Sequence, residues 1–539
     1  MRHGCQYCAT EWSYTSGKAY ANPFDELELD VVFTDGAGLE YRVPAFWAGD
    51  QTWRVRFSPP TQGSYQVRSV CSDASNPDLH DRTDELTVAP YEGSNLLLRH
   101  GPLRVCTDRR YLEHVDDTPF FWLADTWWMG LTRRLAWPDE FHLLLADRVA
   151  KGFSVVQVVA GLYPDMPWRD RRGANESGFP WTEGFERIDP AYFDMADLRI
   201  QALVRAGVVP CIVGCWGYFI RWMGPERMRR HWRYLVARYG AYPVVWCLAG
   251  EATMPYYLSG ERESDAAYQR REWTRLAHFL RELDPYHHPV TIHPTVRGRE
   301  QVEDPTVLDL EMLQTGHVDR DAIPATVATI TAAYEADPRM PVLNGEVCYE
   351  GIFEGSRQEV QRFIFWACVL CGACGHTYGA NGIWQVNTRE RPYGPSPHGF
   401  SWGDTPWEEA MRLPGSAHVS LGKRLLERYP WWRFEPHHEW IEPHWTTRNW
   451  LGPYAAGIPG EIRVVYFPWN TAAAWLREGA FTLKGLEPDV AYRSFFFDPT
   501  SGREHPCDLV PDSTGDASVS HPPIMQDWVL VLERFGGEQ

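Results

Sequence analysis

Two glutamates in this chain share the same local context, each directly after a glycine at the end of a short apolar segment. Glu251 follows the segment 243–250, and Glu346 follows the segment 340–345. Such segments are typical of strands that are buried on both faces of a parallel sheet. In a (β/α) barrel the carboxyl ends of the strands converge on one face, so the two carboxylates would meet there. Two carboxylates in that arrangement are what the hydrolysis of a glycosidic bond requires.

This hydrolysis needs the two carboxyl groups in different protonation states. One must hold a proton near neutral pH, because a leaving alkoxide is too basic to depart unprotonated, and this requires a raised pKa. The other must stay ionised to attack the anomeric carbon. The two carboxyl groups lie about 5–5.5 Å apart in retaining enzymes and about 6.5–9.5 Å apart in inverting ones. The structural alternative is that Glu251 and Glu346 are ordinary salt-bridged carboxylates. Glu350, four residues after Glu346, is an alternative candidate for the ionised carboxylate.

Strands and helices that could position these glutamates alternate between residues 93 and 435. The predicted strands are 120–125, 155–159, 208–213, 243–250, 290–292, 308–313, 342–343 and 376–378. Amphipathic helices are predicted between most of them, for example 138–151 and 266–283. A doubly wound sheet would also alternate, but no glycine-rich phosphate loop follows any strand. The pattern therefore favours a (β/α)8 TIM barrel.

The flanks of this central region read as all-β. Short alternating segments bounded by Gly, Pro or Asp occur at 27–33, 41–47, 52–57 and 64–70, and again at 462–467, 492–497 and 528–532. This spacing is typical of small antiparallel sandwiches. The predicted fold is therefore of the α/β class, with an N-terminal β-sandwich (1–92), a catalytic TIM barrel (93–435) and a C-terminal β-sandwich (436–539).

Further side chains near the ends of predicted barrel strands are candidates for sugar binding. They are Asp125, Trp127, Trp128, Tyr163, Trp216, Gln314, His317, Tyr378, Asn381 and Trp384. Indole rings offer flat apolar platforms to sugar rings, and the polar groups can bind hydroxyls or a catalytic carboxylate. Barrel packing or turn capping is the alternative for each. A tyrosine beside Glu346 would favour its ionised form. Asp165 and Glu176 lie in a long second loop that is expected to wall the pocket.

Two cysteine spacings in the sequence are similar to those of metal sites. Cys368, Cys371 and Cys374 have the C-x₂-C-x₂-C spacing of an iron–sulfur run, but no fourth Cys-Pro follows and the segment continues an amphipathic helix. Cys5 and Cys8 form a single C-x₂-C with no partner pair. We therefore predict neither a catalytic metal nor another cofactor.

Composition narrows the class of partner. The formal net charge of −19, spread along the 539 residues, argues against nucleic-acid binding. The sequence has no apolar run long enough for a membrane span, and its first residues lack the apolar core of a secretory signal. Its 12 cysteines read as reduced thiols rather than a disulfide framework. A cytoplasmic protein acting on a small glycoside or oligosaccharide is expected, and the sequence leaves its oligomeric state open, homo-oligomers included.

Several stretches together resemble the apiosidase-like glycoside hydrolases, a group related to the large clan of retaining TIM-barrel glycosidases. They are FFWLADTWW (120–128), VVWCLAGEAT (244–253), PVLNGEVCYEG (341–351) and GHTYGANGIW (375–384), with YFPWNT and FFFDPTSG in the tail. The resemblance covers essentially the whole chain and implies that Glu251 is the general acid/base and Glu346 the nucleophile. It also implies the flanking β domains. Gly250-Glu251 departs from the Gly-Asp of many members, and its side chain is one methylene longer than Asp, which weakens the transfer of their specificity for apiose to this chain.

The hypothesis is an exo-acting, retaining glycosidase that removes a terminal furanose-type residue, similar to apiose or arabinofuranose. Exo action is inferred from the long second loop and from the 26 tryptophans, which suggest a closed pocket. One alternative is a glycosidase of the same mechanism that acts on a pyranoside. Another is a non-catalytic carbohydrate-binding protein.

Overall fold

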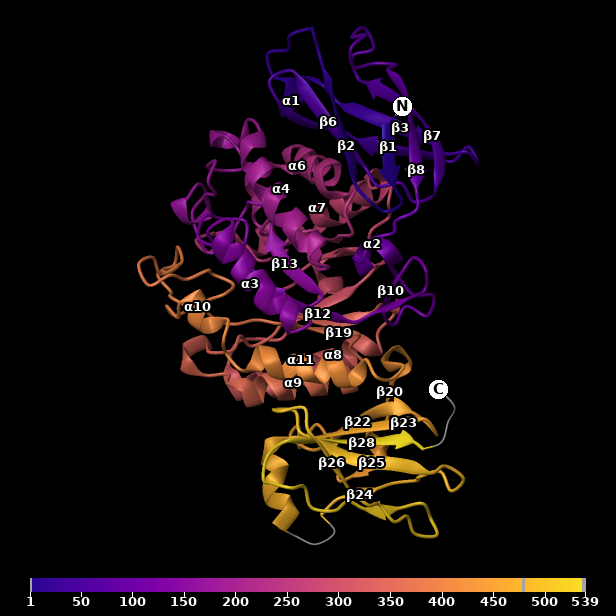
Figure 1. Cartoon of the computed structure of the whole chain (residues 1–539). Helices are drawn as coiled ribbons and strands as arrows, with labels where there is room; N and C mark the ends of the chain where they lie inside the picture. The colour runs from indigo at the N-terminus through magenta and orange to yellow at the C-terminus, as the bar shows by residue number, and fades with distance from the viewer. Residues whose placement is uncertain (1, 477–479, 536–539) are drawn as a thin grey trace.

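The computed structural model describes residues 2–476 and 480–535 of the chain. Three parts follow one another along the long axis of the molecule: an N-terminal β region, a central barrel and a C-terminal β region (Figure 1). None of the helices in the described part of the chain is both long and apolar enough to cross a membrane.

The central sheet is an eight-stranded parallel barrel. Its strands are β12 (Trp122–Thr126), β13 (Val155–Val159), β14 (Val209–Val213), β15 (Val245–Cys247), β16 (Val290–Thr291), β17 (Glu311–Gln314), β18 (Val342–Glu346) and β19 (Gly375–Tyr378). Neighbours in the sheet run from β16 back to β12 and then from β19 to β17, so strands consecutive in sequence lie side by side. The Asp309 amide donates to the Val290 carbonyl (2.8 Å) across the remaining seam. The TIM-barrel prediction is therefore confirmed.

Helices cover the outside of the barrel. They are α3 (Asp139–Ala150), α4 (Pro190–Arg205), α5 (Phe219–Met223), α6 (Pro225–Tyr239), α7 (Arg262–Leu283), α8 (Ala322–Tyr334), α9 (Gln358–Leu370) and α11 (Gly415–Leu426). Pro225 begins α6, where a missing backbone N–H costs nothing, and Trp232 and Leu235 lie on its buried face. The link from β16 to β17 contains only 3-10 turns, among them η3 (Gly298–Gln301) and η4 (Pro305–Val307).

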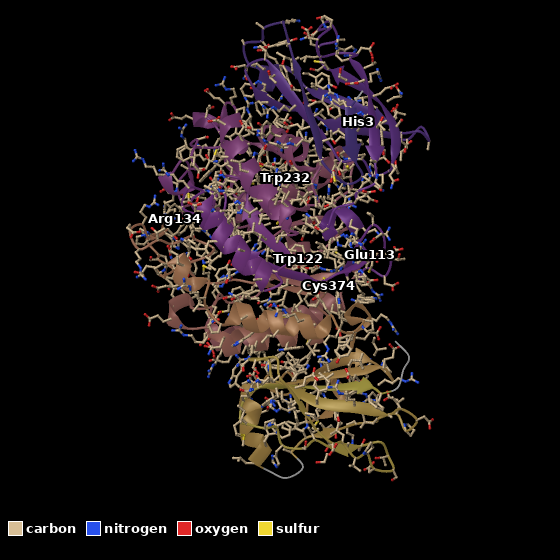
Figure 2. The ribbon with its side chains drawn as sticks, in the orientation of Figure 1. His3, Glu113, Trp122, Arg134, Trp232 and Cys374 are labelled. Carbon is tan, nitrogen blue, oxygen red and sulfur yellow. The ribbon has the colours of Figure 1, made fainter. Side chains whose placement is uncertain are left out.

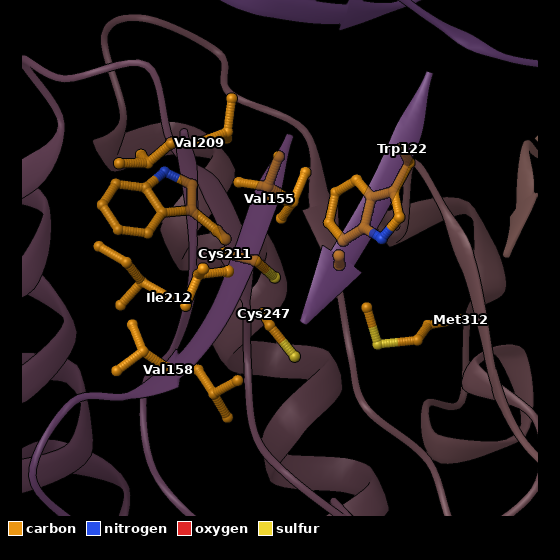
Figure 3. Close-up of a cluster of buried hydrophobic side chains, with 14 of the residues drawn as sticks. Trp122, Val155, Val158, Val209, Cys211, Ile212, Cys247 and Met312 are labelled. Atoms are coloured by element: carbon orange, nitrogen blue, oxygen red, sulfur yellow. The ribbon is translucent and has the colours of Figure 1, made fainter. Parts of the chain in front are cut away.

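The barrel interior is filled by large apolar side chains and small thiols. Trp122, Cys211, Cys247 and Met312 are fully buried and are drawn in Figure 3 with valines of the neighbouring strands. Side chains also fill the layer between the helices and the barrel strands (Figure 2), where the Trp232 ring of α6 lies 5.8 Å from the Trp246 ring of β15. The described cysteines are free thiols, and Cys368, Cys371 and Cys374 are buried around the end of α9.

Two sheets form the N-terminal region. One is β1 (Arg2–Cys5), β8 (Thr83–Ala89), β7 (Gly63–Cys71), β3 (Leu29–Thr34) and β4 (Glu40–Pro44), and the other is β2 (Thr10–Thr15), β6 (Thr52–Phe57) and β5 (Phe46–Gly49). The predicted strand 41–47 is split between the two sheets, because Pro44 has no N–H to continue a ladder. The pairing of β1 with β8 is parallel, unlike the antiparallel arrangement predicted for this region.

A small sheet of β9 (Leu103–Val105), β10 (Leu112–His114) and β11 (Pro119–Phe120) leads into the barrel. Beyond the barrel, β20 (Glu435–Pro436), β22 (Tyr454–Ile458), β23 (Ile462–Phe467), β28 (Trp528–Arg534), β25 (Tyr492–Phe497) and β26 (Glu504–Pro506) form a six-stranded sheet. A second sheet contains β21 (Ile441–Glu442), β24 (Thr482–Leu483) and β27 (Ala517–Ser518). Helix α9 packs on the six-stranded sheet, where Arg362 makes two 2.7 Å hydrogen bonds to Asp527.

Candidate active site

A cavity of about 280 Å³ lies at the carboxyl ends of the barrel strands. Both Glu251 and Glu346 line it, so the fold brings the two predicted carboxylates together. The other lining residues are Trp128, Pro164, Asp165, Trp216, Met254, Tyr257, Gln314, His317, Tyr349, Ile352, Trp384, His398 and Trp402. The cavity therefore combines two facing carboxylates with predominantly aromatic walls.

The glycine before each glutamate allows a close approach at the strand end. A Cβ on Gly250 would lie 2.3 Å from the Trp216 ring, and a Cβ on Gly345 would lie 2.3 Å from Met312 Cγ. Either contact is too short for a real side chain. The repeated Gly-Glu pattern therefore has a packing cause in this structure, and it places a carboxylate next to a tightly packed strand end.

Gln314 links the two carboxylates. The register of β17 and β18 shifts between Leu313 and Gln314, so that Gln314 pairs with Glu346. Gln314 Nε2 lies 3.2 Å from Glu251 Oε1 and 3.2 Å from Glu346 Oε1. One amide group with two N–H donors therefore bonds both acids. The two oxygens are separated by no more than twice that distance.

Glu346 is held among hydrogen-bond donors. His317 Nε2 lies 2.8 Å from its Oε1, and His293 Nε2 lies 3.2 Å from its Oε2. Burial acts to raise the pKa of Glu346, but the two imidazoles outweigh it and hold this pKa well below its ordinary value. Conversely, burial acts to lower the pKa of His317, and Glu346 raises it overall. The carboxylate is therefore ionised at neutral pH.

Glu251 is perturbed in the opposite direction. Burial first, and then the neighbouring charge of Glu346, raise its pKa to about 7. Trp216 Nε1 donates to Glu251 Oε2 over 3.2 Å and fixes the side chain. The backbone of Glu251 has a φ of 42°, in the left-handed region that non-glycine residues rarely adopt. One acid of the pair is thus protonated in part near neutral pH, whereas the other is ionised.

Five of the predicted sugar-binding residues line the cavity: Trp128, Trp216, Gln314, His317 and Trp384. The other five are not among its lining residues. Asp125 accepts hydrogen bonds from Arg148 Nε (2.5 Å) and Trp127 Nε1 (2.8 Å). The Tyr163 hydroxyl bonds that of Tyr192 (2.6 Å), the Tyr378 hydroxyl donates to Glu350 (2.5 Å), and Asn381 Oδ1 accepts from Gln385 (2.8 Å). These five are buried and satisfied by protein partners.

Glu350, the rival carboxylate, is fully buried and does not line the cavity. It accepts hydrogen bonds from Tyr378 and from the Gly415 amide (3.1 Å). The tyrosine beside Glu346 is instead Tyr349, whose hydroxyl accepts a hydrogen bond from Trp128 Nε1 (3.1 Å). Burial and the nearby Glu346 raise the pKa of Tyr349 well above its ordinary value.

The sequence reasoning also missed His293 and the loop after β19. His293 follows the short strand β16, and the pattern Thr-Ile-His at a strand end could have drawn attention to it. His398 and Trp402 belong to the β19 loop, where no periodic pattern indicates a position. Of the two acids expected in the second loop, Asp165 lines the cavity. Glu176 instead pairs with Arg199 (2.7 Å).

Comparison with solved structures places this architecture among the glycoside hydrolases. A structure named "Glycoside hydrolase" matches with a TM-score of 0.66 at 22% identity, over 81% of this chain and 98% of that chain. A family 5 glycoside hydrolase from Bacteroides vulgatus ATCC 8482 matches with a TM-score of 0.65 at 22% identity, over 81% and 93%. A second structure from that organism matches with a TM-score of 0.70 at 17% identity, over 99% and 100%. At these identities the likeness is one of fold.

The family comparison is more specific. Residues 106–433 match the model described as "Apiosidase-like, catalytic domain", and residues 5–72 match a domain of unknown function, DUF5060. No curated protein sequence matches the chain. The chain belongs to the apiosidase-like glycoside hydrolase family, and it is a glycosidase with a carbohydrate substrate.

Proposed function

We propose that the protein is a retaining, exo-acting glycosidase in which Glu251 is the general acid/base and Glu346 is the nucleophile. Glu346 attacks the anomeric carbon while Glu251 gives its proton to the departing oxygen. Water activated by Glu251 then releases the sugar from the glycosyl-enzyme. Five cavity residues are proposed to contact the sugar or orient the acids: Trp128, Trp216, Gln314, His317 and Trp384.

The single observation that carries this proposal is the bridge made by Gln314. Its amide nitrogen lies 3.2 Å from an oxygen of each glutamate, so those two oxygens are no more than twice that distance apart, which is compatible with the separation of about 5–5.5 Å in retaining enzymes. The opposite pKa shifts of Glu251 and Glu346 support the assignment of the two roles.

Exo action is supported by the small cavity and by the contacts that close one side of it. Ser396 Oγ (2.9 Å) and Trp402 Nε1 (3.0 Å) donate to Asp165, which ties the β19 loop to the loop after β13. Tyr393 also donates to the Pro164 carbonyl (2.8 Å). A volume of about 280 Å³ is at the lower end of ligand pockets. This shape suits one terminal sugar better than the interior of a polysaccharide.

A furanose-type substrate, similar to apiose or arabinofuranose, is supported by the match to the apiosidase-like family. The test is a panel of aryl furanosides and pyranosides, with the anomeric form of the first product followed by NMR. We expect cleavage of a furanoside with retention. An inverted product would contradict the roles given to Glu251 and Glu346. Exclusive cleavage of pyranosides would contradict the sugar assignment alone.

A further inference from the structure

Large apolar side chains are exposed on several of the loops that bear the cavity. They are Leu258 (64% exposed), Val318 (63%), Phe353 (53%) and Phe400 (42%). These residues come from the loops after β15, β17, β18 and β19, respectively. The first three each directly follow a residue that lines the cavity, namely Tyr257, His317 and Ile352. Exposed apolar residues from four separate loops therefore gather around the active site.

Aromatic rings among these loops form a connected chain, which we call the aromatic rim: Tyr257, His398, Phe400, Trp402 and Phe353. Tyr257 and His398 stack at 5.2 Å with planes 7° apart, and His398 stacks with Phe400 at 6.1 Å. Phe400 contacts Trp402 at 4.8 Å, and Phe353 contacts Trp402 at 5.8 Å. Three of these residues, Tyr257, His398 and Trp402, also line the cavity. The rim is thus continuous with the catalytic site.

The backbone that carries Phe353 is strained. Its φ is 50°, and Glu354 and Ser356 also have positive φ values of 62° and 50°. Non-glycine residues in the left-handed region are strained and persist where the surrounding structure holds them. Here the strained turn holds an aromatic ring in contact with Trp402 while half of the side chain faces solvent. An exposed phenylalanine in this position gains little from folding alone.

The charged and hydrogen-bonding groups of the cavity and the rim indicate the chemical class of the ligand. Among the described residues that line the cavity, three are carboxylic acids (Asp165, Glu251 and Glu346) and none is Arg or Lys. The His317 imidazole is already bonded to Glu346 (2.8 Å). An anionic sugar or anionic leaving group would therefore find no Arg or Lys partner in this lining. The rim itself has few polar groups, and the Tyr257 hydroxyl already accepts a hydrogen bond from the Asp165 amide (3.1 Å). The rings of the rim, with few unpaired polar groups, can stack against a flat apolar ligand.

We propose that the aromatic rim binds the leaving group of the substrate and that this leaving group is an uncharged aromatic aglycone. The inference rests on the proposed function, because it assumes that the sugar occupies the cavity beside Glu251 and Glu346. The part of the substrate beyond the cleaved bond then emerges at the cavity mouth, against the rings of the rim. Stacking and burial there stabilise a planar apolar group, whereas a chain of further sugars would leave many hydroxyls without partners.

The kinetic test compares two glycosides of apiofuranose, the 2-naphthyl and the methyl derivative, on wild type and on Phe353→Ser with Phe400→Ser. The ratio of variant to wild-type kcat/KM is taken for each substrate separately, so the intrinsic reactivity of each leaving group cancels. We expect the double variant to lose about tenfold to 100-fold on the naphthyl glycoside and far less on the methyl glycoside. Phe353→Trp should keep most of the naphthyl activity. Equal losses on both substrates would overturn the proposal.

A binding test separates this inference from the proposed function. Free 2-naphthol is titrated into wild-type protein and its binding followed by tryptophan fluorescence, with no turnover required. We expect saturable binding that the double variant weakens about tenfold or more. Phe535→Ser removes an exposed phenylalanine (71%) of the C-terminal region and is the matched control, which should bind like wild type. Binding with no glycoside hydrolysis would contradict only the proposed function.

Two other results would overturn the assignment of the rim. Naphthol binding that the double variant leaves unchanged would place the aromatic ligand elsewhere. A wild-type dimer that becomes monomeric in the double variant, measured by light scattering, would show that the rim is covered by a second copy. Thermal unfolding of each variant verifies that the serine substitutions, which are at exposed positions, leave the fold intact.

Discussion

Two groups of carboxylates lie at the strand ends of this barrel, and they differ in what surrounds them. Glu251 and Glu346 form the catalytic pair proposed above. Asp125 and Glu350 belong to a buried cluster with Arg148 and Tyr378. In this cluster the Arg148 guanidinium carbon lies 5.8 Å from the centre of the Tyr378 ring. Burial raises the pKa of Glu350 to about 6, so its pKa alone would make it as plausible an acid as Glu251.

Access and free hydrogen-bonding capacity distinguish the two groups. The side chains of Asp125 and Glu350 are fully enclosed and bonded to protein donors. Glu251 and Glu346 line a cavity, and Glu346 Oε2 has no hydrogen bond of good geometry although His293 lies nearby. Burial therefore raises the pKa of one glutamate in each group, Glu251 and Glu350, but only the pair in the cavity can reach a substrate. The predictions below test this division.

The largest effect is expected for Glu346→Gln. The amide cannot attack the anomeric carbon, so kcat should fall at least about 10⁴-fold on any substrate. The control is Glu350→Gln, the same change four residues further along the chain, which should keep its turnover per folded molecule. Single-turnover kinetics on the best substrate of the aryl glycoside panel measure both. Comparable losses in the two variants would erase the distinction between the clusters.

Glu251→Gln should lower kcat/KM by about 10²–10⁴-fold on substrates with poor leaving groups. The loss should be much smaller on nitrophenyl glycosides, because their leaving group departs without a proton. This dependence on the leaving group separates an acid from a merely structural carboxylate. A uniform loss across leaving groups would argue against the role of Glu251 as the acid.

Asp125→Asn should act on stability instead of chemistry. It removes the buried one of the two carboxylates that pair with the Arg148 guanidinium and leaves only Asp147, which costs up to about 3–5 kcal/mol of unfolding free energy. Asp81→Asn is the matched control, because the exposed pair of Asp81 with Arg68 is worth about 0–1 kcal/mol. Urea unfolding measures both variants. Normal stability with lost activity would instead place Asp125 in the catalytic machinery.

The activity should fall as pH rises through about 7. Glu251 must be protonated to serve as the acid and its pKa is raised to about 7, so kcat/KM should drop about tenfold per unit above that pH. Glu346 has a lowered pKa and stays ionised into acid, so the acidic limb should lie below the ordinary range of a carboxyl group. The pH profile of kcat/KM reports both limbs. A basic limb that persists in Glu251→Gln would assign it to another group.

The smallest effect is expected for His317→Gln. Removing one imidazole that lowers the pKa of Glu346 should move the acidic limb upward by about 1 pH unit, with less than about tenfold loss at neutral pH. His437→Gln, at a histidine that pairs with Glu439, is the control and should leave the profile unchanged. An unaltered acidic limb would show that His317 has no electrostatic influence on Glu346.

Much of the barrel could be predicted because buried parallel strands have a distinctive sequence pattern. The segments 155–159 and 208–213 are nearly unbroken apolar runs, and both fall on strands of the sheet. The split of 41–47 into β4 and β5 was missed because a single run of residues can alternate smoothly while it changes sheets. The pairing of β1 with β8 was missed because no local pattern encodes a partner 80 residues away.

Apolar runs and glycines are local features, so the two Gly-Glu pairs at the ends of buried strands could be predicted without a structure. The sequence did not determine which polar neighbours would face those glutamates. Asp125 and Tyr378 also belong to barrel strands, yet their side chains bond Arg148 and Glu350, whereas His293 and Tyr349 lie near Glu346. Which polar side chains face the two glutamates depends on the three-dimensional fold. The direction of each side chain and the return path of the β19 loop are set by contacts between residues far apart in the chain.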